Sequence, residues 1–440
     1  MGLTSQQVIR DSRDYTLFPW SVQNTAGVVH VIRGEGVWFW DGDGNRWLDF
    51  SSQLINVNIG HQHPKVIAAI KAQADELCVA GPGFATEPRA KLGKKLAEVT
   101  GLAKSLFTLG GTEANESAMK IARLYTSRQK IITRYRSYHG DTMGSMSASG
   151  DFRRWAVEPG VPGFVRVFDP YCYRCPFGKS VDSCGRECVG HIEEIIQLEG
   201  PQTIAAMLVE GITGTNGLLV PPDDYYGKLR ALLDRYGILL IDDEVMSGFG
   251  RTGKWLALDH YGVRPDIVTC SKGLTSSYVP LGATLVSGEI ADHLENHMLW
   301  TGMTCSGHPL ACAAALATLA VYEEEKVFEN VERQGAHLGE RLETMRSNYA
   351  CVGDARYKGL FAMLELVRDK PTKEPLAPYG ASSPEMDRLA AFFRSRRLHT
   401  YVRFNTFFVA PPLIVTGAEL DHGLDIIEAA LAEIDEKLGV

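Results

Sequence analysis

The sequence has no long hydrophobic run and no block of charge of one sign. Its 440 residues carry a formal charge of −8, from 45 Lys and Arg and 53 Asp and Glu. A mild acidic excess argues against general binding to nucleic acid or anionic membranes, because both attract basic surfaces. The longest apolar stretch, residues 309–322, is too short to span a bilayer and is rich in alanine, which predicts a buried helix. We therefore expect neither a nucleic-acid nor a membrane partner.

Features of a secreted protein are also scarce. Residues 1–10 are polar and lack the apolar core of a signal peptide. Nine cysteines, an odd number in a long chain, favour free thiols over a disulfide framework. We expect a cytoplasmic protein, with the ordinary composition of a globular one and a length that suggests two or three domains.

Four of the cysteines form one cluster. Cys172 and Cys175 make a C-x2-C pair, and Cys184 and Cys188 follow closely, a spacing that resembles zinc ligands. Intervening glycine and proline residues predict a loop. The alternative is a surface insertion with free thiols, and nothing else in the segment demands a metal. We assign no metal site, and the role of these thiols stays open.

The chain is organised as an alternation of helices and apolar strands. Strand-length apolar runs are found at residues 105–109, 130–135, 203–210, 237–242 and 266–271. Segments with helical periodicity separate them, which predicts a mostly parallel sheet covered by helices on both faces, an αβα sandwich. Ligands of such sheets bind at the carboxyl ends of the strands.

A smaller α+β domain is expected in the C-terminal part. A long helix, a glutamate-rich helical stretch, short strands and a final amphipathic helix succeed one another after residue 309. Short strands within residues 28–50 turn at residues 41–45, and we expect them to join this smaller domain. The predicted division is residues 1–70 as the joining N-terminal segment, 71–315 as the large domain and 316–440 as the small domain.

Glycine and threonine stand where the first of these strands gives way to a long helix. Gly110, Gly111 and Thr112 occupy the junction. Glycine lets the backbone approach an anion, and the first turn of a helix offers free N–H groups and the positive end of its dipole. A phosphate site is one interpretation, and an ordinary helix cap by Thr112 is the other. No Gly-Lys-Ser/Thr follows, so this is not a Walker loop.

Aromatic and charged side chains end three other strands. Tyr138 and His139 follow residues 130–135, where an aromatic ring can stack on a flat ligand or simply pack in the core. Asp243 lies among three consecutive acids, a costly arrangement unless one of them meets a cation. Lys272 ends an apolar strand, where a desolvated amine with a lowered pKa is a nucleophile for carbonyl groups. A lysine whose amine reaches solvent is the alternative.

Taken together, these features predict a cofactor. One helical crossover separates the strands that precede Asp243 and Lys272, and a right-handed connection would bring those strands close together. A phosphate cradle, a stacking aromatic, a carboxylate and a nucleophilic lysine are the parts that pyridoxal phosphate requires. We therefore predict pyridoxal 5'-phosphate as the cofactor and Lys272 and Asp243 as catalytic residues.

The same residues carry a resemblance to a known family. The chain is similar to class III pyridoxal-phosphate aminotransferases of fold type I, over nearly its whole length. Within the family it resembles most the branch that uses pyruvate with amines, taurine or β-amino acids. The matching stretches are FTLGGTEANESAMKIAR, YRSYHGDTMG, LLIDDEVMSGFGRTG, DIVTCSKGLTSSYVPLGA and TCSGHPLACAAA.

The resemblance implies roles for individual residues. Lys272 would hold the cofactor as a Schiff base and later move a proton, and Asp243 would pair with the ring nitrogen. The implied cofactor contacts also include Gly111 and Thr112 at the phosphate, Tyr138 and Val245 on the two ring faces, His139 and Glu210. Thr304 matches a residue that reaches the phosphate of the neighbouring subunit, which implies a homodimer, with a tetramer of dimers left open.

The residues implied for the substrate pocket each have an alternative interpretation. Trp20, Ile55 and Phe84 match pocket positions of that branch, although each could equally be plain core. Arg403 resembles the arginine that holds a substrate carboxylate, but it lies nearer to Pro411 than the common pattern has it, and an ordinary strand arginine is the alternative.

The implied activity is a ping-pong transamination. An amine, taurine-like or ω- or β-amino acid donor would give its amino group to a keto acid, with pyruvate as the expected acceptor. Thr215 stands where members that use glutamate often carry a glutamate. A racemase, aminomutase, decarboxylase or phospho-lyase on the same fold is the main alternative. A non-enzymatic binding protein is disfavoured, because the lysine, the aspartate and the two threonines occur together.

Overall fold

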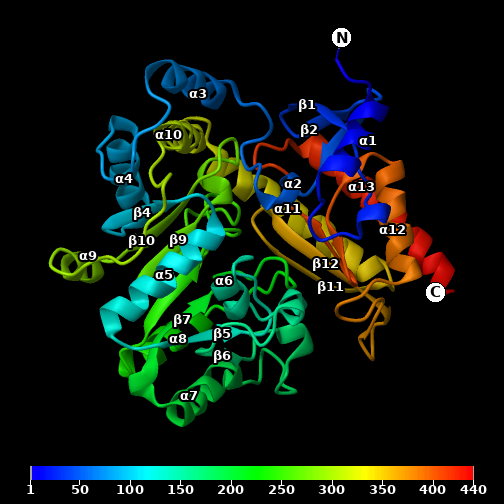
Figure 1. The fold of residues 1–440 in the computed structure, drawn as a ribbon. Helices are drawn as coiled ribbons and strands as arrows, with labels where there is room; N and C mark the ends of the chain where they lie inside the picture. Colours follow the sequence, from blue (N-terminus) through cyan, green and yellow to red (C-terminus); the bar gives the residue numbers. More distant parts are fainter. Residues whose placement is uncertain (1, 440) are drawn as a thin grey trace.

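A seven-stranded sheet forms the centre of the larger part of the molecule in the computed structural model, which describes residues 2–439 (Figure 1). In spatial order its strands are β4 (Lys104–Thr108), β10 (Gly282–Val286), β9 (Ile267–Cys270), β8 (Leu239–Asp243), β7 (Ile204–Val209), β5 (Lys130–Arg134) and β6 (Phe164–Val167). Within the described residues, only β10 runs antiparallel to its neighbours in this sheet. The mostly parallel sheet predicted from the alternating pattern is confirmed.

Helices cover both faces of this sheet, which explains why its strands are apolar throughout. All six residues of β7 are buried. Met207 and Val209 pack into the core beneath α7 (Glu187–Glu199) and α8 (Tyr225–Arg235). Ala206 and Leu208, on the opposite face, pack against α5 (Gly111–Thr126). A strand covered on both sides needs no alternation of polar and apolar residues.

A second group of helices lies at the β4 edge of the sheet. In this group α10 (Pro309–Glu324) packs against α3 (Pro64–Glu76) and α4 (Glu87–Thr100). The alanine-rich stretch predicted as a buried helix is therefore confirmed as α10. Among the described residues, no helix is both long enough and apolar enough to cross a membrane. The shorter helices α6 (Met143–Ala148) and α9 (Gly288–Leu294) belong to the larger part, whereas α2 (Ser52–Ile55) packs against the C-terminal part through Ile55.

The C-terminal part is a mixed structure of helices and an antiparallel sheet. Its strands are β11 (Val352–Lys358), β12 (Phe361–Asp369), β13 (Glu374–Pro375), β15 (Val402–Arg403) and β16 (Thr406–Val409). Its helices are α11 (Val327–Asn348), α12 (Pro384–Ser395) and α13 (Gly417–Leu438). Figure 1 shows α11, α12 and α13 gathered around β11 and β12.

The N-terminal segment joins this C-terminal part through a shared sheet. After α1 (Ser5–Tyr15) the chain forms an antiparallel meander of β1 (Val31–Glu35), β2 (Trp38–Asp41) and β3 (Arg46–Asp49). β3 then pairs in parallel with β14 (Leu398–His399). The side chain of Asp41 accepts hydrogen bonds from the backbone of Asp43 and Asn45, which stabilises the predicted turn. Short 3₁₀ helices complete the chain: η1 (Gln23–Thr25), η2 (Phe152–Ala156), η3 (Cys172–Arg174), η4 (Pro201–Thr203), η5 (Ala257–Tyr261) and η6 (Lys272–Leu274).

The sheet order brings two predicted residues to one edge. β8 and β9 are parallel neighbours, and Asp243 lies opposite Thr269 in their register. Lys272 follows Thr269 by three residues, so both side chains leave the sheet at the carboxyl ends of adjacent strands. The prediction that these two strands lie close together is confirmed.

Candidate active site

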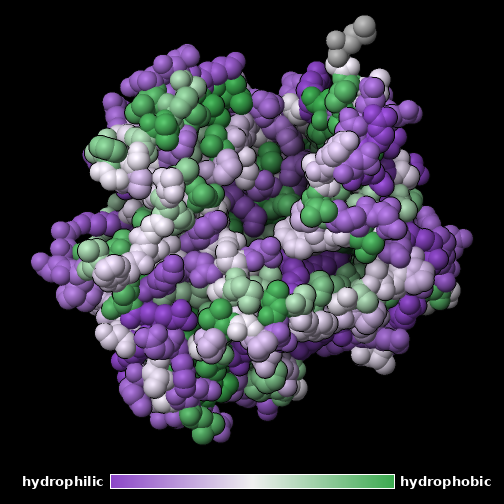
Figure 2. All heavy atoms as spheres, viewed as in Figure 1, coloured by the Kyte–Doolittle hydropathy of each residue, from purple (hydrophilic) through white to green (hydrophobic). Residues whose placement is uncertain are grey.

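A cavity of about 260 Å³ lies where these strand ends meet α2 and segments from the N-terminal and C-terminal parts of the chain. Figure 2 shows the molecular surface hollowed between the part that carries α1 and the part that carries α3 and α10. The cavity is lined by Trp20, Leu54, Ile55, Gly111, Thr112, Asn115, Tyr138, His139, Gly140, Arg153, Glu210, Thr215, Asp243, Val245, Met246, Ser271, Lys272 and Tyr401. It is therefore built from segments that are far apart in the sequence.

Alternation along β8 separates the three consecutive acids. Asp243 lines the cavity, whereas Asp242 and Glu244 point away from it into the core. Burial, together with the charge of Glu244, raises the pKa of Asp242 well above its ordinary value. Burial also raises the pKa of Glu244 to about 6, although that carboxyl accepts hydrogen bonds from Ser247 Oγ (2.6 Å) and the Leu258 N–H (3.3 Å). Asp242 therefore tolerates burial by holding a proton, whereas the carboxyl of Glu244 is stabilised by the hydrogen bonds that it accepts, so neither acid needs a cation.

Asp243 is oriented by three hydrogen bonds. Its Oδ2 atom accepts from Asn115 Nδ2 at 2.7 Å and contacts His139 Nδ1 at 2.8 Å. Its Oδ1 atom accepts the N–H of Val245 at 3.0 Å. Asn115 is itself held by Thr269 Oγ1, which donates to its Oδ1 at 2.7 Å. A carboxylate fixed in this way presents its remaining acceptor capacity to the cavity.

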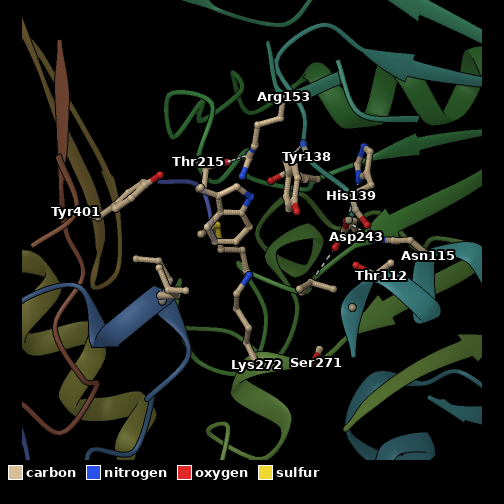
Figure 3. A pocket seen from close by; sticks show the side chains of 18 residues that line it. Thr112, Asn115, Tyr138, His139, Arg153, Thr215, Asp243, Ser271, Lys272 and Tyr401 are labelled. Atoms are coloured by element: carbon tan, nitrogen blue, oxygen red, sulfur yellow. Dashed lines mark hydrogen bonds and ion pairs between the residues drawn. The ribbon is translucent and has the colours of Figure 1, made fainter. Parts of the chain in front are cut away.

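Lys272 enters the cavity from η6, directly after β9 (Figure 3). Burial lowers the pKa of its amine, and the nearby charge of Arg153 acts in the same direction, while Asp243 and Glu210 oppose the change. A lysine with a lowered pKa has a larger neutral fraction at a given pH, and the neutral amine is the nucleophile and the proton acceptor. The structure therefore places a buried lysine amine and a fixed carboxylate in the lining of the same cavity.

The start of α5 forms a cradle for an anion. Gly110 precedes the helix and no side chain caps it, so the N–H groups of the first turn are free. A Cβ atom on Gly111 would lie 2.7 Å from both methyl groups of Val245, which shows how closely the backbone passes the cavity wall. Thr112 Oγ1 accepts the Asp141 N–H at 3.2 Å and keeps its own hydrogen for another acceptor. This arrangement fits a phosphate group.

Tyr138 forms another wall of the cavity. Its N–H donates to Glu210 Oε1 at 3.0 Å, and the other oxygen of Glu210 accepts the Gly214 N–H at 2.7 Å. Burial raises the pKa of Glu210 to about 7. The guanidinium carbon of Arg153 lies 3.5 Å from the centre of the Tyr138 ring, so the ring is held between charged and polar neighbours.

Ten of the predicted site residues line this one cavity: Trp20, Ile55, Gly111, Thr112, Tyr138, His139, Glu210, Asp243, Val245 and Lys272. Three others do not. Phe84 is 71% exposed and lines a separate shallow groove, and Thr304 is exposed. Arg403 is buried behind the cavity wall, where its Nη2 atom donates to Asp151 Oδ2 at 3.0 Å. Arg403 therefore does not line the cavity in which its predicted contact with a substrate carboxylate would be made.

Sequence reasoning missed Asn115, Arg153, Tyr401 and the buried Asp151. Asn115 lies three residues after Thr112 on α5, and this spacing places both on one helix face, a signal that was available. Arg153 stands beside Arg154 and no local pattern distinguishes them. Tyr401 comes to the cavity from the C-terminal part, a placement that depends on long-range packing.

The four-cysteine cluster lines a cavity that is separate from this one. Cys172, Cys175, Cys184 and Cys188 are free thiols that line one small cavity between the loop that follows β6 and the first turn of α7. Burial raises the pKa of Cys188 to about 11. Within residues 2–439, no group of three or more potential ligand side chains could hold a metal ion.

The chain is similar to known proteins over almost its whole length. A family model described as Aminotransferase class-III matches residues 20–431. The leucine/methionine racemase of Thermococcus litoralis is 37% identical, and the match covers 96% of this chain and 94% of that protein. The taurine–pyruvate aminotransferase of Bilophila wadsworthia is 35% identical, with 93% of each chain covered. The structure of taurine:2-oxoglutarate aminotransferase from Bifidobacterium kashiwanohense, in complex with PLP and glutamate, has a TM-score of 0.97 at 40% identity and covers 100% of both chains.

Proposed function

We propose that this chain, which belongs to the class III aminotransferase family, moves the amino group of an amine, a taurine-like compound or an ω- or β-amino acid to a keto acid, with pyruvate as the expected acceptor. The enzyme uses pyridoxal 5'-phosphate. The observation that carries the proposal is that Lys272, Asp243 and the start of α5 line the same cavity. In the ping-pong order that we propose, the donor leaves as a carbonyl product before the keto acid enters.

Lys272 has the central role in the proposed chemistry. When bound, pyridoxal phosphate supplies an aldehyde that joins amines covalently and a ring that withdraws electrons from the carbon next to the nitrogen. Lys272 would hold that aldehyde between turnovers. Its neutral amine, which burial favours, would then take the proton from the substrate carbon that bears the amino group and later return one.

Asp243 would keep the ring nitrogen protonated. A carboxylate that is fixed by Asn115, His139 and the Val245 N–H needs no reorganisation when charge develops beside it. We propose that Val245 and Tyr138 hold the two faces of the ring, and that Gly111 and Thr112 bind the phosphate at the start of α5. Glu210 would act indirectly, because it accepts the hydrogen bond of the Tyr138 N–H and so fixes the backbone of Tyr138.

The choice of donor is proposed from the relatives and from the cavity wall. Two of the similar proteins act on taurine by name, one with pyruvate and one with 2-oxoglutarate. Trp20 and Ile55 line the cavity and would enclose a short donor between apolar surfaces. Phe84 and Arg403 do not line it in their own chain, and their predicted contacts with substrate stay predictions.

We also propose that the enzyme is a cytoplasmic homodimer. Thr304 is exposed, and large apolar side chains such as Leu17 (85% exposed), Val79 (62%) and Trp300 (72%) are uncovered in the single chain. Exposed apolar surface of this kind is typical of an interface. Figure 2 shows part of it beside α3. A partner that covered it could bring its own Thr304 and Phe84 to the cavity. The nine free cysteines support a reducing compartment.

A donor panel tests the proposed function. Taurine, β-alanine, putrescine and alanine would each be offered with pyruvate or 2-oxoglutarate as acceptor, and the amino and carbonyl products would be quantified. We expect one mole of carbonyl product for each mole of new amino acid. Inversion of a chiral amino acid with no carbonyl product would support a racemase instead, an outcome that the similarity to a leucine/methionine racemase makes worth measuring.

A further inference from the structure

We propose that a second cavity binds a small oxyanion, such as free phosphate or the carboxylate of an organic acid, and that this ligand acts on the active cavity through residues 215–217. The second cavity has a volume of about 140 Å³ and lies beside the active cavity, since Thr215 lines both. The oxyanion site does not depend on the proposed function, but its expected effect on turnover rests on it, because that effect is measured with a keto acid.

Two arginine side chains in the second cavity have free hydrogen-bond donors. Arg136, which follows β5, and Arg174, at the end of η3, both line it. Within residues 2–439, the guanidinium of Arg136 donates no hydrogen bond, and Nη1 of Arg174 donates none either. Guanidinium groups form their strongest hydrogen bonds with carboxylate and phosphate oxygens. The free donors of this cavity therefore match an oxyanion.

Both arginines are held in place although these donors are free. The guanidinium carbon of Arg136 lies 4.8 Å from the ring centre of Tyr171 and 5.2 Å from that of Tyr379, so two cation–π contacts restrict it. Arg174 Nε donates to Glu365 Oε1 at 2.6 Å. Donors that are fixed before the ligand arrives lose less conformational entropy when it binds. The site is therefore largely formed in the absence of its ligand.

Positive charge is in excess around the second cavity. Glu365 is its one acidic lining residue among those that the structure describes, and besides Arg174 it already accepts hydrogen bonds from the Tyr171 hydroxyl and from Arg356 Nη1. Burial alone would raise the pKa of Glu365, but the charge of Arg356 and these hydrogen bonds hold it below its ordinary value, so the carboxylate is ionised. Around this wall four arginines lie among three carboxylates: Arg134, Arg136, Arg174 and Arg356 with Asp169, Asp354 and Glu365. An excess positive charge that is partly removed from water favours an anionic ligand.

Residues 215–217, between β7 and α8, form part of the wall of the active cavity. Thr215 Oγ1 accepts a hydrogen bond from Arg153 Nη2 at 3.1 Å, and Figure 3 shows the two side chains together at the cavity. Asn216 Nδ2 donates to Asp151 Oδ2 at 3.3 Å. A change in the position of this segment would therefore reach charged groups at the active cavity.

The same segment is bound to the second cavity. The Gly217 carbonyl oxygen accepts a hydrogen bond from Arg356 Nε at 2.8 Å, and Arg356 shares Glu365 with Arg174. A chain of hydrogen bonds thus joins the oxyanion site to the active cavity, and a bound anion adds a negative charge beside their common wall. That charge should oppose the entry of an anionic keto acid into the active cavity.

Binding is tested on the holoenzyme, in which the cofactor would already fill the cradle at the start of α5. Calorimetry would measure the dissociation constants of inorganic phosphate and of acetate, which separates the two sources of an oxyanion. The variants are Arg136→Gln and Arg174→Gln in the second cavity and Arg153→Gln in the active cavity. Arg154→Gln is the matched control, because Arg154 lines neither cavity and pairs with Glu158.

We expect the wild type to bind at least one of the two anions saturably, and Arg136→Gln and Arg174→Gln to weaken that binding by roughly 10- to 100-fold, the usual loss for a charge-assisted hydrogen bond. Arg153→Gln and Arg154→Gln should stay within about threefold of the wild type, because they remove only a more distant charge. If Arg174→Gln does not fold, because Glu365 has lost a partner, Arg136→Gln decides. Its side chain has no hydrogen bond to lose within the described chain.

Two binding results would overturn the site: no saturable binding of either anion to the wild type, or binding that Arg153→Gln abolishes and Arg136→Gln leaves unchanged. The second result would show that the anion lies in the active cavity instead.

The link to the active cavity is tested by the KM for pyruvate with and without a saturating amount of the anion that binds. We expect the anion to raise this KM by roughly threefold or more in the wild type and to have no effect on Arg136→Gln. An unchanged KM in the wild type would contradict the link, and an equal rise in both proteins would place the anion in the active cavity. If no donor reacts with pyruvate, the proposed function fails, and the calorimetric comparison still decides whether the oxyanion site exists.

Discussion

The two ends of the cavity are each organised around one buried carboxylate, but they are built differently. Asp243 is held by a side-chain amide, a histidine ring and a backbone N–H, all from elements that belong to or cover the central sheet. Asp151 is held by two guanidinium groups from outside the central sheet, one on the 3₁₀ helix η2 and one at the end of the short strand β15. Substitutions at the Asp243 end would disturb the central sheet. The Asp151 end lies on segments outside that sheet, where substitutions are tolerated better. The comparison shows that the residues proposed for the chemistry lie at the end of the cavity that the central sheet fixes.

The largest expected effect is at the Asp243 end. Lys272→Ala removes the amine that would hold the cofactor and move the proton, and we expect turnover to fall by a factor of about 10⁴ or more. Measurement of single-turnover transfer from the best donor checks this. Lys254→Ala, at an exposed position in the same part of the chain, is the control and should retain activity. Near-normal turnover in Lys272→Ala would contradict the role proposed for Lys272.

The next prediction separates the two carboxylates. Asp151→Asn leaves two guanidinium groups without their shared charge, and we expect a loss of about 3–5 kcal/mol in the free energy of unfolding. Asp243→Asn leaves no buried arginine without its partner, so the unfolding free energy of the cofactor-free protein should change by less than half as much. Its turnover should nevertheless fall by about 10²–10³-fold. Denaturant unfolding of both cofactor-free variants, beside their activities, makes the comparison, and equal losses of stability would contradict it.

A pH dependence of stability is expected from Glu210. Burial raises its pKa from 4.5 to about 7 in the folded protein. An acid with a raised pKa binds its proton more tightly when folded, so its contribution to stability is lost as the pH rises from about 4.5 to about 7. The loss for this group is about 3 kcal/mol. Glu210→Gln should remove it.

The measurement is the unfolding free energy of cofactor-free wild type and Glu210→Gln at pH 5 and pH 8. The wild type should lose more stability than the variant between these values. Asp242, whose pKa is also raised, adds a slope of the same sign to both proteins and cancels in the difference. Parallel pH profiles for the two proteins would show that Glu210 is already ionised at pH 5.

The smallest expected effect is at the start of α5. A Cβ at position 111 would lie 2.7 Å from the Val245 methyl groups, so Gly111→Ala must push one wall of the cradle aside. Overpacking of this kind costs about 1–3 kcal/mol, and we expect cofactor affinity to fall by roughly tenfold or more. Gly93→Ala is the matched control, because it lies inside α4 and no atom lies within 4 Å of the position that its new Cβ would take. That variant should bind the cofactor normally and gain about 0.5–1 kcal/mol of stability.

The sequence predicted the Asp243 end far better than the Asp151 end. The pairing of β8 with β9 brings Asp243 and Lys272 together. Apolar runs such as that of β7 identify the strands of the sheet in the sequence. The mostly parallel sheet and the fold type I architecture are confirmed, the latter by the structural match at a TM-score of 0.97. Domain boundaries near residues 70 and 315 stay predictions.

The Asp151 end could not be predicted, because each of its contacts joins distant segments. Arg403 meets Asp151 across 252 positions of the chain, and no local pattern records that pairing. The resemblance led to Arg403 because its strand carries the family's arginine, but Asp151 lies between that arginine and Arg153. Only the three-dimensional structure shows which of the two guanidinium groups lines the cavity.

The central claim is that Lys272 is the amine that holds the cofactor. Borohydride reduction of the holoenzyme, followed by proteolysis and mass spectrometry, tests it directly, because reduction makes the link between amine and cofactor permanent. The account predicts one pyridoxyl group for each chain, on the peptide that contains Lys272. A label on any other lysine, or protein that takes up no cofactor and carries no label, would contradict it.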